Sequence, residues 1–284
     1  MSESVIIDGR VYAKEVQESL KERVAAIVEK TGVAPILATI LVGEFGPSVT
    51  YVKMKGNACV RVGVEPLKIE MPESSTTQDV IDEINRLNAD KRVAGILLQH
   101  PVPAHIDEQK CFNSIAFEKD VDGVNVASFG AMTMGLKGFK PATPLAVMSL
   151  IERYKIEVAG KNVVVIGRSP ILGKPVAMLL LNADATVTIC HSKTKNLAEI
   201  VKGADVVVAA VGRPLFVKAE WLKPGVVIID AGYNAGNVGD VDLENCAPVS
   251  SAYTPVPGGV GPVTIIKLIE QTVLSAENAE GIGQ

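Results

Sequence analysis

The stretch KNVVVIGRSPILGKPVAMLLL, residues 161–181, decides the fold of this chain. A short aliphatic run leads into a turn that holds Gly167, Ser169 and Gly173, and a run typical of a helix follows. A strand, a tight turn and a helix in this order present backbone N–H groups and the positive end of a helix dipole to a phosphate. The spacing differs from the usual GxGxxG. The motif therefore predicts a dinucleotide site, with a plain turn into a helix as the alternative.

The loop after the next strand indicates which dinucleotide such a site would bind. Folds that prefer NAD place Asp or Glu about 20 residues past the turn, where the carboxylate accepts from the ribose 2′-OH. Here the predicted strand 186–190 leads into Ser192 and Lys193 instead. A hydroxyl and a cation suit a 2′-phosphate, and Arg168 in the turn adds a second cation. The pattern favours NADP, with a solvated basic loop as the alternative.

Outward from this stretch, short aliphatic runs alternate with helix-like segments, which indicates βαβ units and a mostly parallel sheet. The predicted strands are 36–42, 67–70, 95–98, 162–166, 186–190, 206–210 and 226–230, and the predicted helices are 11–30, 48–62, one opened by Thr76 and Thr77, 144–154 and 263–275. The sequence therefore predicts an α/β fold with two α/β lobes around a cleft. The C-terminal lobe is expected to be a Rossmann-type dinucleotide-binding domain.

Segments rich in Gly and Pro indicate the domain boundaries. We interpret 119–143 as a connection between the lobes, which gives a first α/β domain at 1–142 and a dinucleotide-binding domain at 143–262. The last predicted helix, about 263–276, is assigned to the first domain. We expect PVPGGVGP, residues 255–262, to form a shaped loop and the polar tail 276–284 to fray.

Composition excludes several classes of protein. The 284 residues carry 28 Lys and Arg against 32 Asp and Glu, a net charge of −4 that provides no field for a polyanion. Aromatic residues make up only 4%, too few for a base-stacking platform, and no apolar run reaches the ~18 residues of a membrane helix. The N-terminus lacks the basic-then-apolar order of a signal peptide. Four separated cysteines and three scattered histidines argue against a metal site. We expect a cytoplasmic protein with no nucleic-acid or membrane partner.

The first half contains a few polar residues in suggestive positions. Tyr51 and Lys55 are four apart on a predicted helix, so they share one face. Gln99 ends the predicted strand GILLQ, and Asp122 lies in the loop KDVDG. Taken singly, a helix-surface lysine is more often solvated than catalytic, and a loop aspartate more often forms a turn.

Nine motifs in a fixed order raise the significance of these residues. They are YVKMK, GILLQHPVP, KDVDG, PATP, GRSPILGKP, CHSKT, AAVGRP, GDVD and TPVPGGVGP. In sequence and spacing, from about Ile6 to Ser275, the chain resembles the bifunctional methylenetetrahydrofolate dehydrogenase/methenyltetrahydrofolate cyclohydrolase family. PVPGGVGP together with GRSxxxGxP is a highly specific pair.

The resemblance implies an NADP-dependent oxidation of 5,10-methylenetetrahydrofolate to the methenyl compound, followed by hydrolysis to 10-formyltetrahydrofolate. It implies Lys55 as the catalytic lysine, with Tyr51 and Gln99 beside it, and Asp122 as the acid that binds the pterin. The other residues that it implies are Gly258, Gly259 and Pro262 for the substrate, and Gly167, Arg168, Ser169, Ser192 and Tyr233 for the cofactor. It also implies a homodimer.

The chain departs from the family pattern at several positions. The loop 124–131 is rebuilt, Ala142 replaces a usual Cys, and Asn57 replaces a frequent Lys. His100 stands where the family usually has Leu; an imidazole there can tune the pH response of the site, although a packed, neutral histidine is the commoner case. Three alternatives stay open: a dehydrogenase with weakened cyclohydrolase activity, a non-catalytic NADP-binding sensor, and another two-lobed α/β dehydrogenase.

Overall fold

The computed structural model describes residues 4–43 and 46–282, and these divide into two compact units. Unit 1 combines the residues up to Ala13 with Thr143–Thr264. Unit 2 combines Lys14–Ala142 with the residues from Ile265 onward. Helices α1 (Gly9–Thr31) and α10 (Val260–Glu280) therefore contribute residues to both units.

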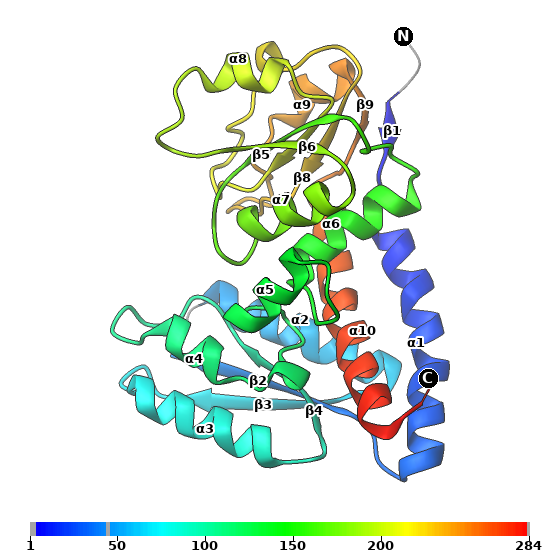
Figure 1. The fold of residues 1–284 in the computed structure, drawn as a ribbon, viewed down its shortest axis with the longest axis vertical. Helices are drawn as coiled ribbons and strands as arrows, with labels where there is room; N and C mark the ends of the chain where they lie inside the picture. Colours follow the sequence, from blue (N-terminus) through cyan, green and yellow to red (C-terminus); the bar gives the residue numbers. More distant parts are fainter. Residues whose placement is uncertain (1–3, 44–45, 283–284) are drawn as a thin grey trace. The chain divides into compact units, whose positions relative to one another are not determined.

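Unit 1 is built on a six-stranded sheet whose strands pair only in parallel, in the order β1-β9-β8-β7-β5-β6. In Figure 1, the blue strand β1 lies beside β9, its partner in this sheet. The strands are β1 (Val5–Ile6), β5 (Asn162–Ile166), β6 (Thr186–Cys190), β7 (Val206–Ala209), β8 (Val226–Asp230) and β9 (Ser250–Tyr253). The chain runs from β5 to β6 at the edge and returns to β7 on the other side of β5. The strand order thus reverses between β5 and β7, the place where open α/β sheets bind ligands.

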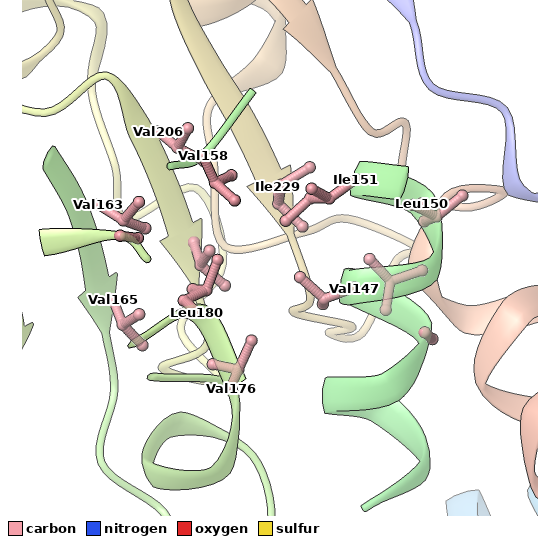
Figure 2. Packing of buried hydrophobic residues seen from close by; sticks show 14 of the residues in the cluster. Val147, Leu150, Ile151, Val158, Val163, Val165, Val176, Leu180, Val206 and Ile229 are labelled. Carbon is pink, nitrogen blue, oxygen red and sulfur yellow. The ribbon is translucent and has the colours of Figure 1, made fainter. Parts of the chain in front are cut away.

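Helices α6 (Ala142–Arg153) and α7 (Gly173–Asn182) supply much of the core of unit 1, while α8 (Leu197–Lys202) and α9 (Leu243–Cys246) are short. Figure 2 shows Val163 and Val165 of β5 packing with Val176 and Leu180 of α7. Ile7, which follows β1, is fully buried in the same cluster. The continuous valine and isoleucine runs of β5 and β7 are typical of strands covered on both faces.

Unit 2 contains a three-stranded parallel sheet in the order β3-β2-β4. The strands are β2 (Ile36–Val42), β3 (Glu65–Met71) and β4 (Val93–Leu98), and the helices besides α1 and α10 are α2 (Gly46–Val62), α3 (Thr77–Ala89), α4 (Glu108–Ser114) and α5 (Val126–Thr133). Every residue of β2, the central strand, and of β4 is buried, whereas β3, at the edge opposite β4, is largely exposed. Thr76 caps α3 by accepting from the N–H of Asp79, whose carboxylate accepts in return from the N–H of Thr76.

The predicted α/β class, the parallel sheets and the Rossmann-type arrangement are confirmed, and the strands 36–42, 162–166, 186–190 and 226–230 have the predicted bounds. Three expectations were wrong. The predicted connection 119–143 contains α5, because Asn125 caps it by accepting from the N–H of Ser128 at 2.6 Å. The predicted loop 255–262 ends in the first turn of α10, where Pro262 loses no helical hydrogen bond.

The third wrong expectation concerns the C-terminal tail. Helix α10 continues to Glu280, since Arg23 of α1 donates two hydrogen bonds to Glu277, at 2.8 and 2.6 Å. Lys30 reaches the carbonyl oxygen of Glu280 at the end of the same helix. Within the described residues, no helix is both long enough and apolar enough to cross a membrane.

Candidate functional site

The turn between β5 and α7 can exist only with glycine at two positions. Gly167 has φ +132°, and a Cβ there would lie 2.1 Å from the carbonyl oxygen of Ala210 after β7. A Cβ on Gly173 would lie 2.3 Å from the carbonyl oxygen of Gly167. The Oγ of Ser169 accepts from the N–H groups of Leu172 and Gly173 at 3.2 Å each, so it ties the turn to the start of α7. The close approach of helix and strands is the geometry that dinucleotide-binding turns need.

The loop after β6 lies next to this turn, because the N–H of Gly167 donates to the carbonyl oxygen of Cys190 at 2.9 Å. The loop closes on itself through hydrogen bonds from His191 N to Thr194 Oγ1, at 2.9 Å, and from Thr194 N to the His191 carbonyl, at 2.8 Å. Ser192 and Lys193 are exposed on it, as Arg168 is on the neighbouring turn. Exposed cations and a hydroxyl on this turn and the neighbouring loop are side chains that fit a ribose 2′-phosphate, which a carboxylate would repel.

Two buried carboxylates shape the carboxyl ends of β7 and β8. Asp240 accepts from three successive N–H groups, those of Val211, Gly212 and Arg213, at 2.6 to 2.9 Å. Asp230 accepts from Gly232, Asp240 and Val241 at 2.9 to 3.0 Å, and burial raises its pKa to about 6. These carboxylates thereby fix the backbone at the carboxyl ends of β7 and β8.

The remaining predicted residues of unit 1 lie in three places. Tyr233 follows β8, is 54% exposed and donates its hydroxyl hydrogen to Asn237. Gly258 has φ +115°, and its carbonyl oxygen accepts from the N–H of Gly9 at 2.9 Å. Gly259 donates to the Pro255 carbonyl at 2.8 Å, and Pro262 lies in the first turn of α10.

In unit 2 the structure brings Lys55 and Gln99 into direct contact: the Lys55 ammonium donates to Gln99 Oε1 at 3.0 Å. Gln99 is held on both sides, since its N–H donates to the Ile40 carbonyl at 2.8 Å and its side-chain amide donates to the His100 carbonyl at 2.7 Å. Tyr51 lies one turn before Lys55 on α2 and is half-buried, as Lys55 is. A lysine from one helix thus meets the end of a buried strand.

Lys55 and Asp122 influence each other electrostatically. Burial lowers the pKa of Lys55, and the negative charge of Asp122 opposes this shift. Burial raises the pKa of Asp122, and the charge of Lys55, the N–H of Ala142 and the charge of His100 oppose it. A lysine whose charged form is disfavoured can exchange protons nearer neutrality than an exposed one.

Several residues of these regions escaped the sequence analysis. Glu108 binds His100, with 2.7 Å between Glu108 Oε1 and His100 Nδ1. Asp120, two residues before Asp122, is fully buried and accepts from the N–H groups of Val124 and Asn125 at 3.1 and 3.0 Å. The only signal for Asp120 was the doubled aspartate of KDVDG, and Asp240 was marked only by the motif GDVD. In the part of the chain that the structure describes, no three His, Cys, Asp or Glu side chains gather as metal ligands would.

Two family models match the chain. The model described as "Tetrahydrofolate dehydrogenase/cyclohydrolase, catalytic domain" matches residues 7–122, and "Tetrahydrofolate dehydrogenase/cyclohydrolase, NAD(P)-binding domain" matches residues 141–280. The "Bifunctional protein FolD" of Cellvibrio japonicus is 56% identical over 274 residues, which cover 96% of this chain and 98% of that protein.

Solved structures agree with these matches. The crystal structure of the bifunctional FolD methylenetetrahydrofolate dehydrogenase/cyclohydrolase from Campylobacter jejuni is 43% identical, with a TM-score of 0.94 over 97% of this chain and 99% of that one. The Trypanosoma brucei dehydrogenase-cyclohydrolase, complexed with NADP cofactor and inhibitor, is 38% identical, with a TM-score of 0.95 over 99% of both chains. The chain therefore belongs to the tetrahydrofolate dehydrogenase/cyclohydrolase family.

Proposed function

We propose that this chain oxidises 5,10-methylenetetrahydrofolate with NADP and then hydrolyses the resulting 5,10-methenyl compound to 10-formyltetrahydrofolate. The observation that carries the proposal is the hydrogen bond from Lys55 to Gln99, together with the electrostatic interaction between Lys55 and the half-buried carboxylate of Asp122. Membership of the family supports both reactions. The two reactions make different demands on the residues, so they are best considered separately.

For the oxidation, the protein mainly has to position the substrate against the cofactor. NADP, when bound, supplies the acceptor for the hydride that leaves the methylene carbon, and the folate nitrogens on either side stabilise the cation that remains. No general base is needed for this step. The Asp122 carboxylate can accept from the N–H donors of the pterin edge, a directional and charge-assisted contact that fixes the substrate. Gly258, Gly259 and Pro262 are proposed to line the substrate site.

NADP is proposed to bind at the carboxyl ends of β5 and β6. Gly167 lets the backbone approach the phosphates closely, and Arg168, Ser169 and Ser192 supply cationic and hydroxyl partners. Tyr233 is proposed as a further cofactor contact, because it is exposed after β8 at the same edge of the sheet. The arrangement favours NADP over NAD.

The hydrolysis needs a group that moves protons. Water must add to the methenyl carbon, lose a proton and allow the ring to open. Lys55 suits this role, because burial lowers its pKa and a cationic substrate nearby disfavours its protonated form further. Gln99 holds the lysine in place through its 3.0 Å hydrogen bond. Tyr51, one turn away on the same helix, is proposed to orient the lysine and the water.

Substitution of the lysine tests this division of roles. Lys55→Met should lower the hydrolysis rate of methenyltetrahydrofolate at least about 100-fold, because it removes a general acid–base while keeping the length of the side chain. Hydrolysis is followed by the loss of methenyl absorbance, and NADP binding by calorimetry should stay as in the wild type. Lys53→Met, an exposed position on the same helix, is the control. Unchanged hydrolysis in Lys55→Met contradicts the proposed role.

An assay that starts from 5,10-methylenetetrahydrofolate and NADP, and follows the absorbance of NADPH and of the methenyl compound, separates the alternatives. A dehydrogenase with weakened cyclohydrolase activity forms NADPH and accumulates the methenyl compound, and a non-catalytic sensor forms neither. We further propose that the protein is a cytoplasmic homodimer that acts in one-carbon metabolism. Light scattering that gives the mass of one 30.0 kDa chain would contradict the dimer.

A further inference from the structure

Gln271 is a polar residue of α10 that is only 6% exposed. Its side-chain nitrogen donates to the carbonyl oxygens of Val121, at 2.7 Å, and of Lys140, at 2.8 Å. Its side-chain oxygen accepts from the N–H of Lys140 at 2.9 Å. Burying an amide is costly unless its polar groups are paired, and here both donors and the acceptor are used. The partners lie 150 and 131 residues earlier in the chain, so one side chain joins three distant segments.

One of these contacts holds the peptide group that leads into Asp122. The Val121 carbonyl and the Asp122 N–H belong to the same planar peptide unit, which ends at the Cα of Asp122. A hydrogen bond that fixes the Val121 carbonyl therefore restricts the atom from which the Asp122 carboxylate projects.

The residue after Asp122 packs against the second segment that Gln271 holds. A Cβ on Gly123, whose φ is +60°, would lie only 2.4 Å from the carbonyl carbon of Lys140. The N–H of Ala142, two residues beyond Lys140, donates to the Asp122 carboxylate. Asp122 is thus attached to both of the segments that the Gln271 amide joins.

We propose that Gln271 is a positioning residue for substrate binding: by joining the Val121 carbonyl to the Lys140 backbone, it holds Asp122 where its carboxylate can meet the pterin edge. The inference rests on the proposed function, because it takes Asp122 as the residue that binds the substrate. Hydrogen bonds to a rigid edge weaken when the acceptor moves or turns. Gln271 needs no contact with the substrate in this role, since its effect passes through Asp122.

A double-mutant cycle for tetrahydrofolate binding, measured by calorimetry in the presence of NADP, tests this role. Tetrahydrofolate has the pterin edge of the substrate but no methylene bridge, so it binds without turnover. Gln271→Met keeps the length of the side chain, removes its hydrogen bonds and should raise the Kd about 5-fold, because the Asp122 contact is misplaced rather than lost. Asp122→Ala removes the contact itself and should raise the Kd at least about 10-fold.

The comparison that separates positioning from general support is Gln271→Met in the Asp122→Ala background. If Gln271 acts through Asp122, the added substitution should change the Kd by less than about 2-fold there, because the carboxylate that it positions is gone. A residue that only supports the fold would give the same loss in both backgrounds. Equal losses in the two backgrounds, or an unchanged Kd in Gln271→Met alone, would overturn the inference.

Ser275→Ala is the matched control. Ser275 is also buried on α10, and its hydroxyl donates to the Glu118 carbonyl at 2.8 Å, four residues before Asp122. The substitution removes a hydrogen bond from the same helix to a backbone carbonyl that does not adjoin Asp122, so the Kd for tetrahydrofolate should stay as in the wild type. Far-UV circular dichroism checks the folding of each variant. If Gln271→Met does not fold, Gln271→Glu takes its place, because an ionised glutamate keeps the size and the acceptor for the Lys140 N–H but has no donor.

Failure of the proposed function gives a different result. If the wild-type protein does not bind tetrahydrofolate, or if Asp122→Ala binds it as tightly as the wild type does, the role of Asp122 in substrate binding is wrong. If Asp122→Ala weakens binding and the Gln271 variants do not, the inference about Gln271 fails alone.

Discussion

A methyl group added to Gly173 would collide with backbone atoms, which cannot move aside as the end of a flexible side chain can. Its nearest neighbours would be the carbonyl oxygen and carbon of Gly167, at 2.3 and 2.5 Å, and both are backbone atoms. Gly173→Ala should therefore push α7 away from β5 and lower the free energy of unfolding of unit 1 by at least about 2 kcal/mol. Urea unfolding followed by fluorescence of Trp221, the single tryptophan and a residue of unit 1, measures this.

The matched control for Gly173 is Gly203, at the end of α8. It has φ −83°, and an added Cβ would make only an ordinary contact of 3.6 Å with the Ile200 carbonyl. Gly203→Ala should be neutral or stabilise by up to about 1 kcal/mol, because alanine restricts the unfolded chain more than glycine does. Equal losses in both variants would show that the close approach at Gly173 is not what matters.

Ser192 is the residue on which the cofactor preference depends most directly. Ser192→Asp would introduce a carboxylate where the 2′-phosphate is proposed to bind, and like charges at close range cost several kcal/mol. We expect the Kd for NADP to rise at least about 10-fold while the Kd for NAD, which lacks the phosphate, changes little. Isothermal calorimetry with both nucleotides measures the ratio.

The control adds the same charge to the opposite end of the same strand. Thr186 opens β6 and is exposed there, so Thr186→Asp should leave both affinities unchanged. A parallel loss of NADP and NAD affinity in Ser192→Asp would mean that the loop is merely distorted, and the proposed phosphate contact would then be abandoned.

At the scale of elements, the ends of β7 and β8 depend on the buried pair Asp230 and Asp240. Burial raises the pKa of Asp230 to about 6, against about 3.9 in an unfolded chain. Between these values the native state binds more protons than the unfolded state. The contribution of Asp230 to stability is therefore complete below about pH 4 and is lost as pH rises through about 6, an effect of about 3 kcal/mol.

Asp230→Asn isolates this dependence, because the amide does not titrate. The difference in free energy of unfolding between wild type and Asp230→Asn should shrink as the pH is raised from 4.5 to 7. Asp205→Asn is the reference: the Lys223 hydrogen bond lowers the pKa of Asp205, so its titration lies below this range and its difference from wild type should stay flat. A difference for Asp230→Asn that grows with pH would contradict the raised pKa.

At the scale of the whole molecule, the elements that could be predicted were those whose sequence signal lies within a few neighbouring residues. Strands such as β2 and β5 are continuous aliphatic runs bounded by turns, and their ends were predicted without error. Strands β1 and β9 were missed, because they have only two and four residues and are defined by their pairing: β1 pairs with β9, from the other end of the chain, and β9 also pairs with β8. Helix α5 was missed because the glycines around it outweighed the single cap of Asn125.

The residues of the candidate site also divide into those with a local sequence signal and those without one. The shared helix face of Tyr51 and Lys55 and the strand end at Gln99 followed from periodicity, and the structure adds the 3.0 Å contact between Lys55 and Gln99. The supporting carboxylates of Asp120 and Asp240 could not be predicted, since their partners are backbone N–H groups of irregular turns. The sequence contains no side-chain pattern that shows which backbone N–H groups of such a turn will be available to donate to a carboxylate.

The interleaving of the two units also makes unit 1 depend on the first residues of the chain. Ile7 is completely buried in the core of unit 1, its N–H donates to the Tyr253 carbonyl at 2.8 Å, and β1 covers the edge of β9. Ile7→Ala should lower the free energy of unfolding seen by Trp221 fluorescence by about 2–4 kcal/mol. Val5→Ala, at a position of the same segment that is 52% exposed, should cost less than about 0.5 kcal/mol.

If the two variants lose the same stability, Ile7 is not part of the core that holds the sheet, and a fragment starting at Thr143 should then fold without residues 1–13. If only Ile7→Ala is destabilised, that fragment should fail to bind NADP, because its sheet lacks both the buried isoleucine and the strand that protects β9.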